Sequence, residues 1–161
     1  SVGIAGQTLV ATALGAGSVS RARQLTRATG RAGLVTGAII GVVFAIVGLF
    51  AGHLFSPTPH VQILIAVGMV AMGVFFPLQG WMMAIDGILI GARDYRYLAG
   101  TCTLTAVVYI ALILVLASIV TPIMPNDLSR TAMLWAAFNV VLMGGRGLFN
   151  GLRVRSDVWM K

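Results

Sequence analysis

Residues 32–85 read AGLVTGAIIGVVFAIVGLFAGHLFSPTPHVQILIAVGMVAMGVFFPLQGWMMAI and contain no Asp, Glu, Lys or Arg. A second run without these residue types covers positions 97–126. About 20 apolar residues in a helix cross the hydrocarbon core of a bilayer, so each run is long enough for at least one crossing. The chain is therefore predicted to be an all-α integral membrane protein, and its function is one carried out in a bilayer.

The composition agrees with this prediction. The 161 residues are 58% hydrophobic and only 9% charged, whereas an ordinary soluble domain is about 25% charged. The net charge of +7 comes from basic residues that gather in clusters between the apolar runs. The clusters are Arg21, Arg23, Arg27 and Arg31, then Arg93 and Arg96, then Arg146, Arg153, Arg155 and Lys161. No aromatic or polar surface accompanies them, so they favour the cytoplasmic face of a membrane over a nucleic-acid partner.

Glycine and proline divide the chain into spans. Residues 1–17 are predicted to be the end of a transmembrane helix whose beginning is missing, which suggests a fragment of a longer protein. Residues 18–31 form a basic segment, either an amphipathic helix or a helix extension at an anionic membrane surface. Four complete transmembrane helices are predicted at 32–52, 61–91, 98–120 and 131–150, followed by a tail at 151–161.

The loops between these spans test the topology, because successive loops alternate sides of the membrane. The loops at 18–31 and 92–97 and the tail hold nearly all the basic charge, whereas the loops at 53–60 and 121–130 hold only Arg130. Basic loops stay in the cytoplasm. We therefore expect a multi-pass protein of the cell (inner or plasma) membrane with a cytoplasmic C-terminus, and the lipid bilayer is its first partner.

The span at 61–91 has the features of a cavity wall. Pro77 in its middle removes a backbone hydrogen bond and is expected to kink the helix. Side chains at spacings of three and four share one face. These are Met69, Met72, Phe76, Gln79, Met83 and Asp86. Methionine and phenylalanine adapt to irregular apolar ligands, and the two polar residues could anchor a cation. Helix–helix packing is the alternative interpretation of the same stripe.

Asp86 is the most informative single residue, because an ionisable group within an apolar span is costly and is a functional candidate. A coupling or substrate-binding role is one possibility. The other is structural: Asp86 could cap a short helix that begins at Gly87, or pair with Arg93 or Arg146.

Other polar residues carry less information. Asn139, within the last span, needs a partner and is expected to bond another helix or to line a polar path. His53 and His60 lie in an outer loop, as interfacial residues or as pH sensors. The sequence contains no metal-ligand cluster, no nucleophile–base pair and no phosphate loop. We therefore expect neither an enzyme, nor a metal site, nor a cofactor.

Two strings resemble those of the multidrug and toxic compound extrusion (MATE) transporters. The first is Gly6-Gln7-Thr8-Leu9-Val10, followed by Gly15-Ala16-Gly17. The second is Asp86-Gly87-Ile88-Leu89-Ile90-Gly91-Ala92-Arg93-Asp94, which is similar to the tenth helix of that family and its following loop. The resemblance covers essentially the whole chain and is closest to the branch named after DNA-damage-inducible protein F.

This resemblance implies a protein of twelve helices in two lobes, of which the chain would form most of the C-terminal lobe. Its partners would be the missing N-terminal lobe and amphipathic cationic small molecules, exported by antiport against H⁺ or Na⁺. The candidate residues for binding a substrate or cation remain those that the spacing and polarity of the spans indicate, namely Asp86, Gln79, Met83, Phe76, Met72 and Asn139. Sodium-coupled members have a carboxylate nearer to Gln79 than to Asp86, which weakens the case for sodium coupling in this lobe.

Two other functions stay open at this stage. A lipid-linked oligosaccharide flippase of the same superfamily would need several cationic residues in its cavity to hold a pyrophosphate, and the span interiors contain no Lys or Arg. A small structural membrane subunit would need a complete first helix.

Overall fold

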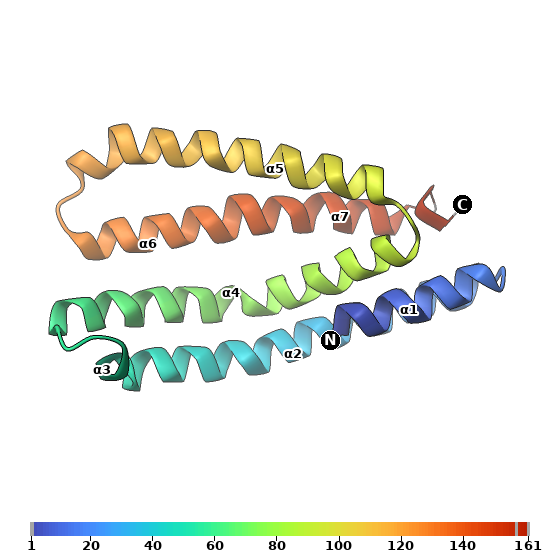
Figure 1. The fold of residues 1–161 in the computed structure, drawn as a ribbon, viewed down its shortest axis with the longest axis horizontal. Coiled ribbons are helices and arrows are strands. Elements are labelled where there is room, and N and C mark those ends of the chain that lie inside the picture. The colour runs from blue at the N-terminus through green and yellow to red at the C-terminus, as the bar shows by residue number, and fades with distance from the viewer. Residues whose placement is uncertain (1, 157, 161) are drawn as a thin grey trace.

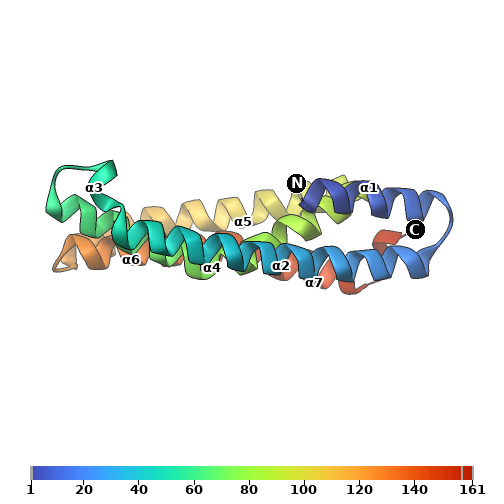
Figure 2. The ribbon, with the colours of Figure 1, turned by 90° about the horizontal axis from the view of Figure 1, so that it is seen from below.

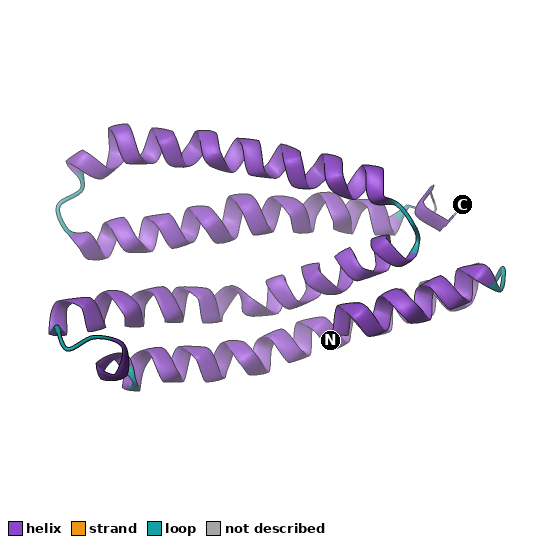
Figure 3. Cartoon of the chain, viewed as in Figure 1, coloured by secondary structure: helices purple, strands orange, loops and turns teal. Residues whose placement is uncertain are grey.

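The computed structural model describes residues 2–156 and 158–160. Helices account for nearly all of this part of the chain, and none of the described residues lies in a strand (Figure 3). Four helical stretches are long and apolar enough to cross a membrane, as the sequence predicts. These stretches are Val19–Phe50, Pro59–Gly91, Tyr95–Ile123 and Asp127–Arg155.

The long stretches are built from several elements. The α-helices are α1 (Val2–Gly15), α2 (Val19–Phe50), α3 (Gly52–Phe55), α4 (Pro59–Gly91), α5 (Tyr95–Val115), α6 (Asp127–Ala137) and α7 (Gly145–Arg155). A π-helical segment, η1 (Leu116–Val120), and a 3₁₀ turn, η2 (Thr121–Ile123), extend α5. A second π-helical segment, η3 (Phe138–Gly144), joins α6 to α7, and a 3₁₀ turn, η4 (Val158–Met160), follows.

The long helices lie side by side in one row, in the order α2, α4, α6–α7 and α5 (Figure 1). The row is thin when it is turned by 90° (Figure 2), and α1 packs against both α2 and α4. The turns after α1 and α4 and the end of α7 lie at one end of the row, which we call the basic end. The loop after α3, which contains Pro57, and the segment between η1 and α6, which contains Pro122 and Pro125, lie at the other end, which we call the proline end.

The helices extend past the predicted bounds, most of all at the basic end. Val19 already begins α2, so of the two alternatives for the basic segment at 18–31 the helix extension is confirmed and the separate amphipathic helix is wrong. Similarly, α7 continues to Arg155, so the predicted tail begins as helix. Arg, Ala and Gln propagate a helix well, and no proline interrupts either junction. With 32 residues, α2 is about 48 Å long and exceeds the hydrocarbon core, which is about 30 Å thick.

Glycines bring α2 and α4 into backbone contact. A Cβ at Gly33 would meet the carbonyl oxygen of Gly80, and a Cβ at Gly41 would meet that of Gly73. Small residues let transmembrane helices approach closely, which is how they associate when water supplies no hydrophobic drive. Further along α4, α1 takes over this contact, because Gly87 lies against the carbonyl of Gly3.

The buried core lies at the basic end and includes α1, α2, α4 and η4. Its members are Val10, Ala13, Ala22, Ile85, Ile88, Leu89 and Trp159. The turn after α1 closes with hydrogen bonds from Gly17 N to Leu14 O and from Ser18 N to Ala13 O, and Gly17 has φ 70°. This is a Schellman motif, and it confirms the predicted helix stop. On α4, the buried residues at this end are Met82 and those at 84–89, which include Asp86.

Candidate functional site

Polar side chains of α4 form two clusters with the helices of the following hairpin. The first, the amide cluster, lies near the middle of the row. Gln79 donates a hydrogen bond from Nε2 to Oδ1 of Asn139 at 2.7 Å. Asn139 Nδ2 donates to the carbonyl of Trp135 at 2.8 Å and lies 3.9 Å from the sulfur of Met72. Asn139 is fully buried, so the expected bond to another helix is confirmed.

Both helices of the amide cluster are irregular at this level. In α4, Pro77 lies two residues before Gln79, and the helix changes direction near its middle (Figure 1). Proline removes the hydrogen bond to the residue four positions earlier. That residue is Gly73, whose carbonyl is directed at Gly41 of α2. On the other side, Asn139 belongs to the π-helical segment η3, and π-bulges are frequent at functional sites.

The second cluster, the acid cluster, lies nearer to the basic end. Arg146 Nη2 donates to Asp86 Oδ2 at 2.5 Å, and Asn150 Nδ2 donates to the other carboxylate oxygen at 2.7 Å. Thr101 of α5 donates to Asn150 Oδ1 at 3.1 Å. Asp86 is only 7% exposed. Its carboxylate therefore joins α4 to α7 directly and to α5 through Asn150.

These contacts select among the alternatives for Asp86. Its partner is Arg146, one of the two arginines that we predict as partners from the sequence. The capping interpretation is wrong, because α4 continues without a break through Gly87 to Gly91. Sequence reasoning missed Asn150 and Thr101. The only signal for Asn150 was its spacing of four from Arg146, which puts both side chains on one helix face.

A further ion pair fastens the turn between α4 and α5 to α7. Arg153 donates to both carboxylate oxygens of Asp94, at 2.7 and 3.3 Å. Its guanidinium lies 4.7 Å from the centre of the Tyr97 ring, and the Tyr97 hydroxyl donates to the carbonyl of Phe149. The sequence nominates none of these pairings. They add stiffness at the basic end beside the acid cluster.

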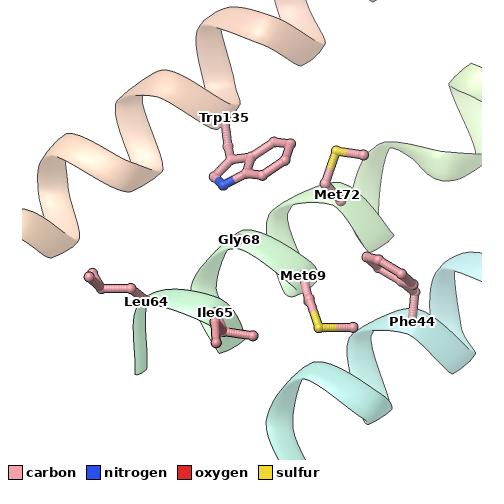
Figure 4. A pocket seen from close by; sticks show the side chains of 7 residues that line it. All are labelled: Phe44, Leu64, Ile65, Gly68, Met69, Met72 and Trp135. Atoms are coloured by element: carbon pink, nitrogen blue, oxygen red, sulfur yellow. The ribbon is translucent and has the colours of Figure 1, made fainter. Parts of the chain in front are cut away.

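Two apolar cavities flank the amide cluster. The first, of about 360 Å³, lies between α2, α4 and α6 and is lined by Phe44, Met69, Met72 and Trp135, among others (Figure 4). In this view the side chains of three helices surround the cavity. The second, of about 340 Å³, lies among α1, α2 and α4. It is lined in part by Phe76, Gln79 and Met83.

The predicted stripe on α4 is therefore divided. Met69 and Met72 line the first cavity. Phe76, Gln79 and Met83 line the second. Asp86 lines neither cavity, because its carboxylate is turned toward Arg146 of α7. The histidines lie away from both clusters. His60 pairs with Asp127 at 3.2 Å at the proline end, and His53 is exposed in α3.

The fold and its polar clusters define a multi-pass helical membrane protein. The sequence profile of the MatE family matches residues 1–115, and the chain belongs to this family. Protein DETOXIFICATION 42 of Arabidopsis thaliana is 28% identical to the chain over 115 residues. That alignment covers 71% of this chain but only 22% of the plant protein, so the chain matches under a quarter of its relative. The search of solved structures found no significant match to the chain.

Proposed function

We propose that this chain forms most of the C-terminal lobe of a secondary antiporter that exports amphipathic organic cations. Membership of the MatE family, whose members are transporters, supports transport across a membrane. The observation that carries the proposal is the amide cluster, a buried polar group between two apolar cavities at a level where both supporting helices are irregular. A transport site combines these features, because it must bind an amphipathic ligand and also change shape.

The residues would have distinct roles in this mechanism. The rings of Phe44 and Trp135 and the sulfurs of Met69 and Met72 would hold the apolar body of a substrate. Aromatic faces also attract organic cations. The amide oxygen of Gln79 would provide the polar contact, and the fully buried Asn139 would hold the Gln79 amide in position. Bending of α4 at Pro77 would let the lobe rock between its two orientations, and H⁺ or Na⁺ would be the coupling ion.

Asp86 would act as a positioning residue in this scheme. Its charge is already matched by Arg146, and its other oxygen is bonded to Asn150. A carboxylate in these contacts has little to offer a coupling ion until the contacts break. We therefore place coupling in the N-terminal lobe. The flippase alternative needs cations in the cavity, and neither cavity flanking the amide cluster has Arg or Lys among its described lining residues.

Efflux by the complete protein in proteoliposomes tests the proposal. A proton or sodium gradient is imposed, and the release of a fluorescent organic cation is followed for the wild type, Gln79→Leu and Gln62→Leu. Gln62 is a matched control, because it lies on α4 but bonds the Ser56 carbonyl at the proline end. Gradient-driven efflux that is lost in Gln79→Leu and kept in Gln62→Leu supports the proposal. The absence of efflux under either gradient contradicts it.

A further inference from the structure

A groove on the face of α4 and α7 lies outside both polar clusters. Its volume is about 310 Å³, and Leu78 and Trp81 of α4 form one wall. Leu148 and Leu152 of α7 contribute the other wall, and glycines form its floor. The one charged side chain among its described lining residues is Arg155. The groove is therefore apolar along its length and cationic at the basic end.

The indole of Trp81 connects this groove to α2. Its five-membered ring lies against Gly30 of α2, and its six-membered ring lies against Gly147 and Gly151 of α7. One side chain of α4 thus spans the distance between the two neighbouring helices. Tryptophan is enriched where the hydrocarbon meets the polar headgroups, and Gly30 lies at the boundary between the basic segment and the charge-free run of α2.

Three arginines lie close in sequence to the glycines that contact the indole, two of them further toward the basic end. Arg27 is three residues before Gly30, and Arg155 is four residues after Gly151, so they lie about 4.5 and 6 Å further toward that end. Arg31 is next to Gly30 in α2. All three side chains are exposed. Among the residues that the structure describes, none of the three has a carboxylate partner, in contrast to Arg146 and Arg153.

We propose that this groove binds a phospholipid with an anionic headgroup. Arg155, which lines the groove, holds the phosphate, and Arg27 and Arg31, which lie near Gly30 on α2, attract the rest of the headgroup. Trp81 lies at the level of the ester groups, and one acyl chain follows the apolar walls. Charge complementarity selects this occupant over a neutral lipid. A packed protein helix would cover the apolar part and leave three cations unmatched. The inference is independent of what the protein transports.

Native mass spectrometry of the complete protein tests this site. The detergent-solubilised protein is titrated with dioleoyl phosphatidylglycerol or with dioleoyl phosphatidylcholine, and the Kd of the first bound lipid is measured. A juxtamembrane arginine contributes about a fivefold gain in affinity for an anionic lipid. Arg27→Gln with Arg155→Gln should therefore weaken phosphatidylglycerol binding by about 25-fold. Phosphatidylcholine should bind more weakly than phosphatidylglycerol to the wild type.

A second double variant controls for net charge. Arg21 and Arg96 are also exposed and lie at the basic end, but neither lines the groove or lies within four residues of a glycine that contacts the indole. Arg21→Gln with Arg96→Gln should therefore leave the Kd unchanged. Gly147→Leu fills the groove without altering charge and should weaken binding as well. Equal losses in both arginine pairs would show diffuse attraction and overturn the proposal. Equal binding of the two lipids, displacement by inorganic phosphate alone, or a groove closed by another helix would also overturn it.

Discussion

Arg146 of α7 donates a hydrogen bond to Asp86 of α4 at 2.5 Å, although the two residues are 60 positions apart in the chain. Asn150, one turn later on α7, donates to the second oxygen of the same carboxylate. The arginine side chain is 22% exposed and the aspartate side chain 10% exposed, so water screens this pair only weakly. The Asp86 carboxylate therefore connects α4 to α7 directly, and to α5 through the bond between Asn150 and Thr101.

Asp86→Asn should destabilise the protein, because it leaves the Arg146 guanidinium partly buried without its counter-charge. Removing one partner of a buried pair costs about 3 kcal/mol. The measurement is the unfolding temperature of the complete protein in detergent. Asp86→Asn with Arg146→Gln removes both charges and should recover much of the loss. Asp127 offers a control, since its ion pair with Arg130 is exposed, and Asp127→Asn should cost at most about 1 kcal/mol. Equal losses at Asp86 and Asp127 would contradict this account.

Asn139→Leu should also destabilise the protein, because the amide of Gln79 then loses its acceptor inside the row of helices. A buried polar group left without a partner costs about 1–3 kcal/mol. Adding Gln79→Leu replaces both amides by apolar groups, and this double variant should be more stable than Asn139→Leu alone. Thermal unfolding of the wild type, Asn139→Leu, Gln79→Leu and the double variant completes a double-mutant cycle. Additive losses from the two substitutions would show that the observed 2.7 Å contact contributes nothing.

The helix count and the alternation of loops could be predicted because the thickness of a bilayer imposes them on the sequence. The amide cluster was partly foreseeable, since Asn139 within an apolar span demands a partner. Its partner Gln79 could not be deduced from spacing, because the rotation of α6–α7 about its axis depends on packing. That rotation is influenced by the π-helical segment η3, for which the sequence carries no pattern that we recognise.

In the acid cluster, too, the sequence could not decide which residue pairs with which. Arg146 is one of two arginines that a sequence argument offers Asp86, and only the crossing of α4 and α7 decides between them. Arg93, the other candidate, has φ 61° and ends the α4 turn. Its side chain is exposed at that turn, whereas the side chain of Arg146 contacts Asp86. The predicted stripe on α4 does not form the wall of a single cavity. Asp86 is turned toward α7 and away from both cavities, and helix packing again decides this orientation.

Arg93→Gly should stabilise the protein. Arg93 N bonds Ile90 O and Asp94 N bonds Leu89 O, which is the Schellman arrangement that normally has glycine at the left-handed position. A side chain in that conformation costs about 1 kcal/mol, so its removal should raise the unfolding temperature. Arg27→Gly removes the same charge in the interior of α2, where glycine costs about 1 kcal/mol in helix propensity. The two substitutions should therefore shift the unfolding temperature in opposite directions. Equal shifts would indicate that charge, and not backbone strain, controls this turn.

Gly41→Ala should separate α2 from α4 and destabilise the protein. The added Cβ would meet the carbonyl oxygen of Gly73, which is the carbonyl freed by Pro77, so α2 must move away from the kink. Forcing extra volume into a tight contact costs about 1–3 kcal/mol, which exceeds the gain in helix propensity of about 1 kcal/mol. Gly100 in α5 has nothing within 4 Å of its Cβ position, so Gly100→Ala should express that gain alone and stabilise the protein. Thermal unfolding of both variants gives the comparison. A Gly41→Ala protein as stable as Gly100→Ala would mean that α2 and α4 do not touch at this level.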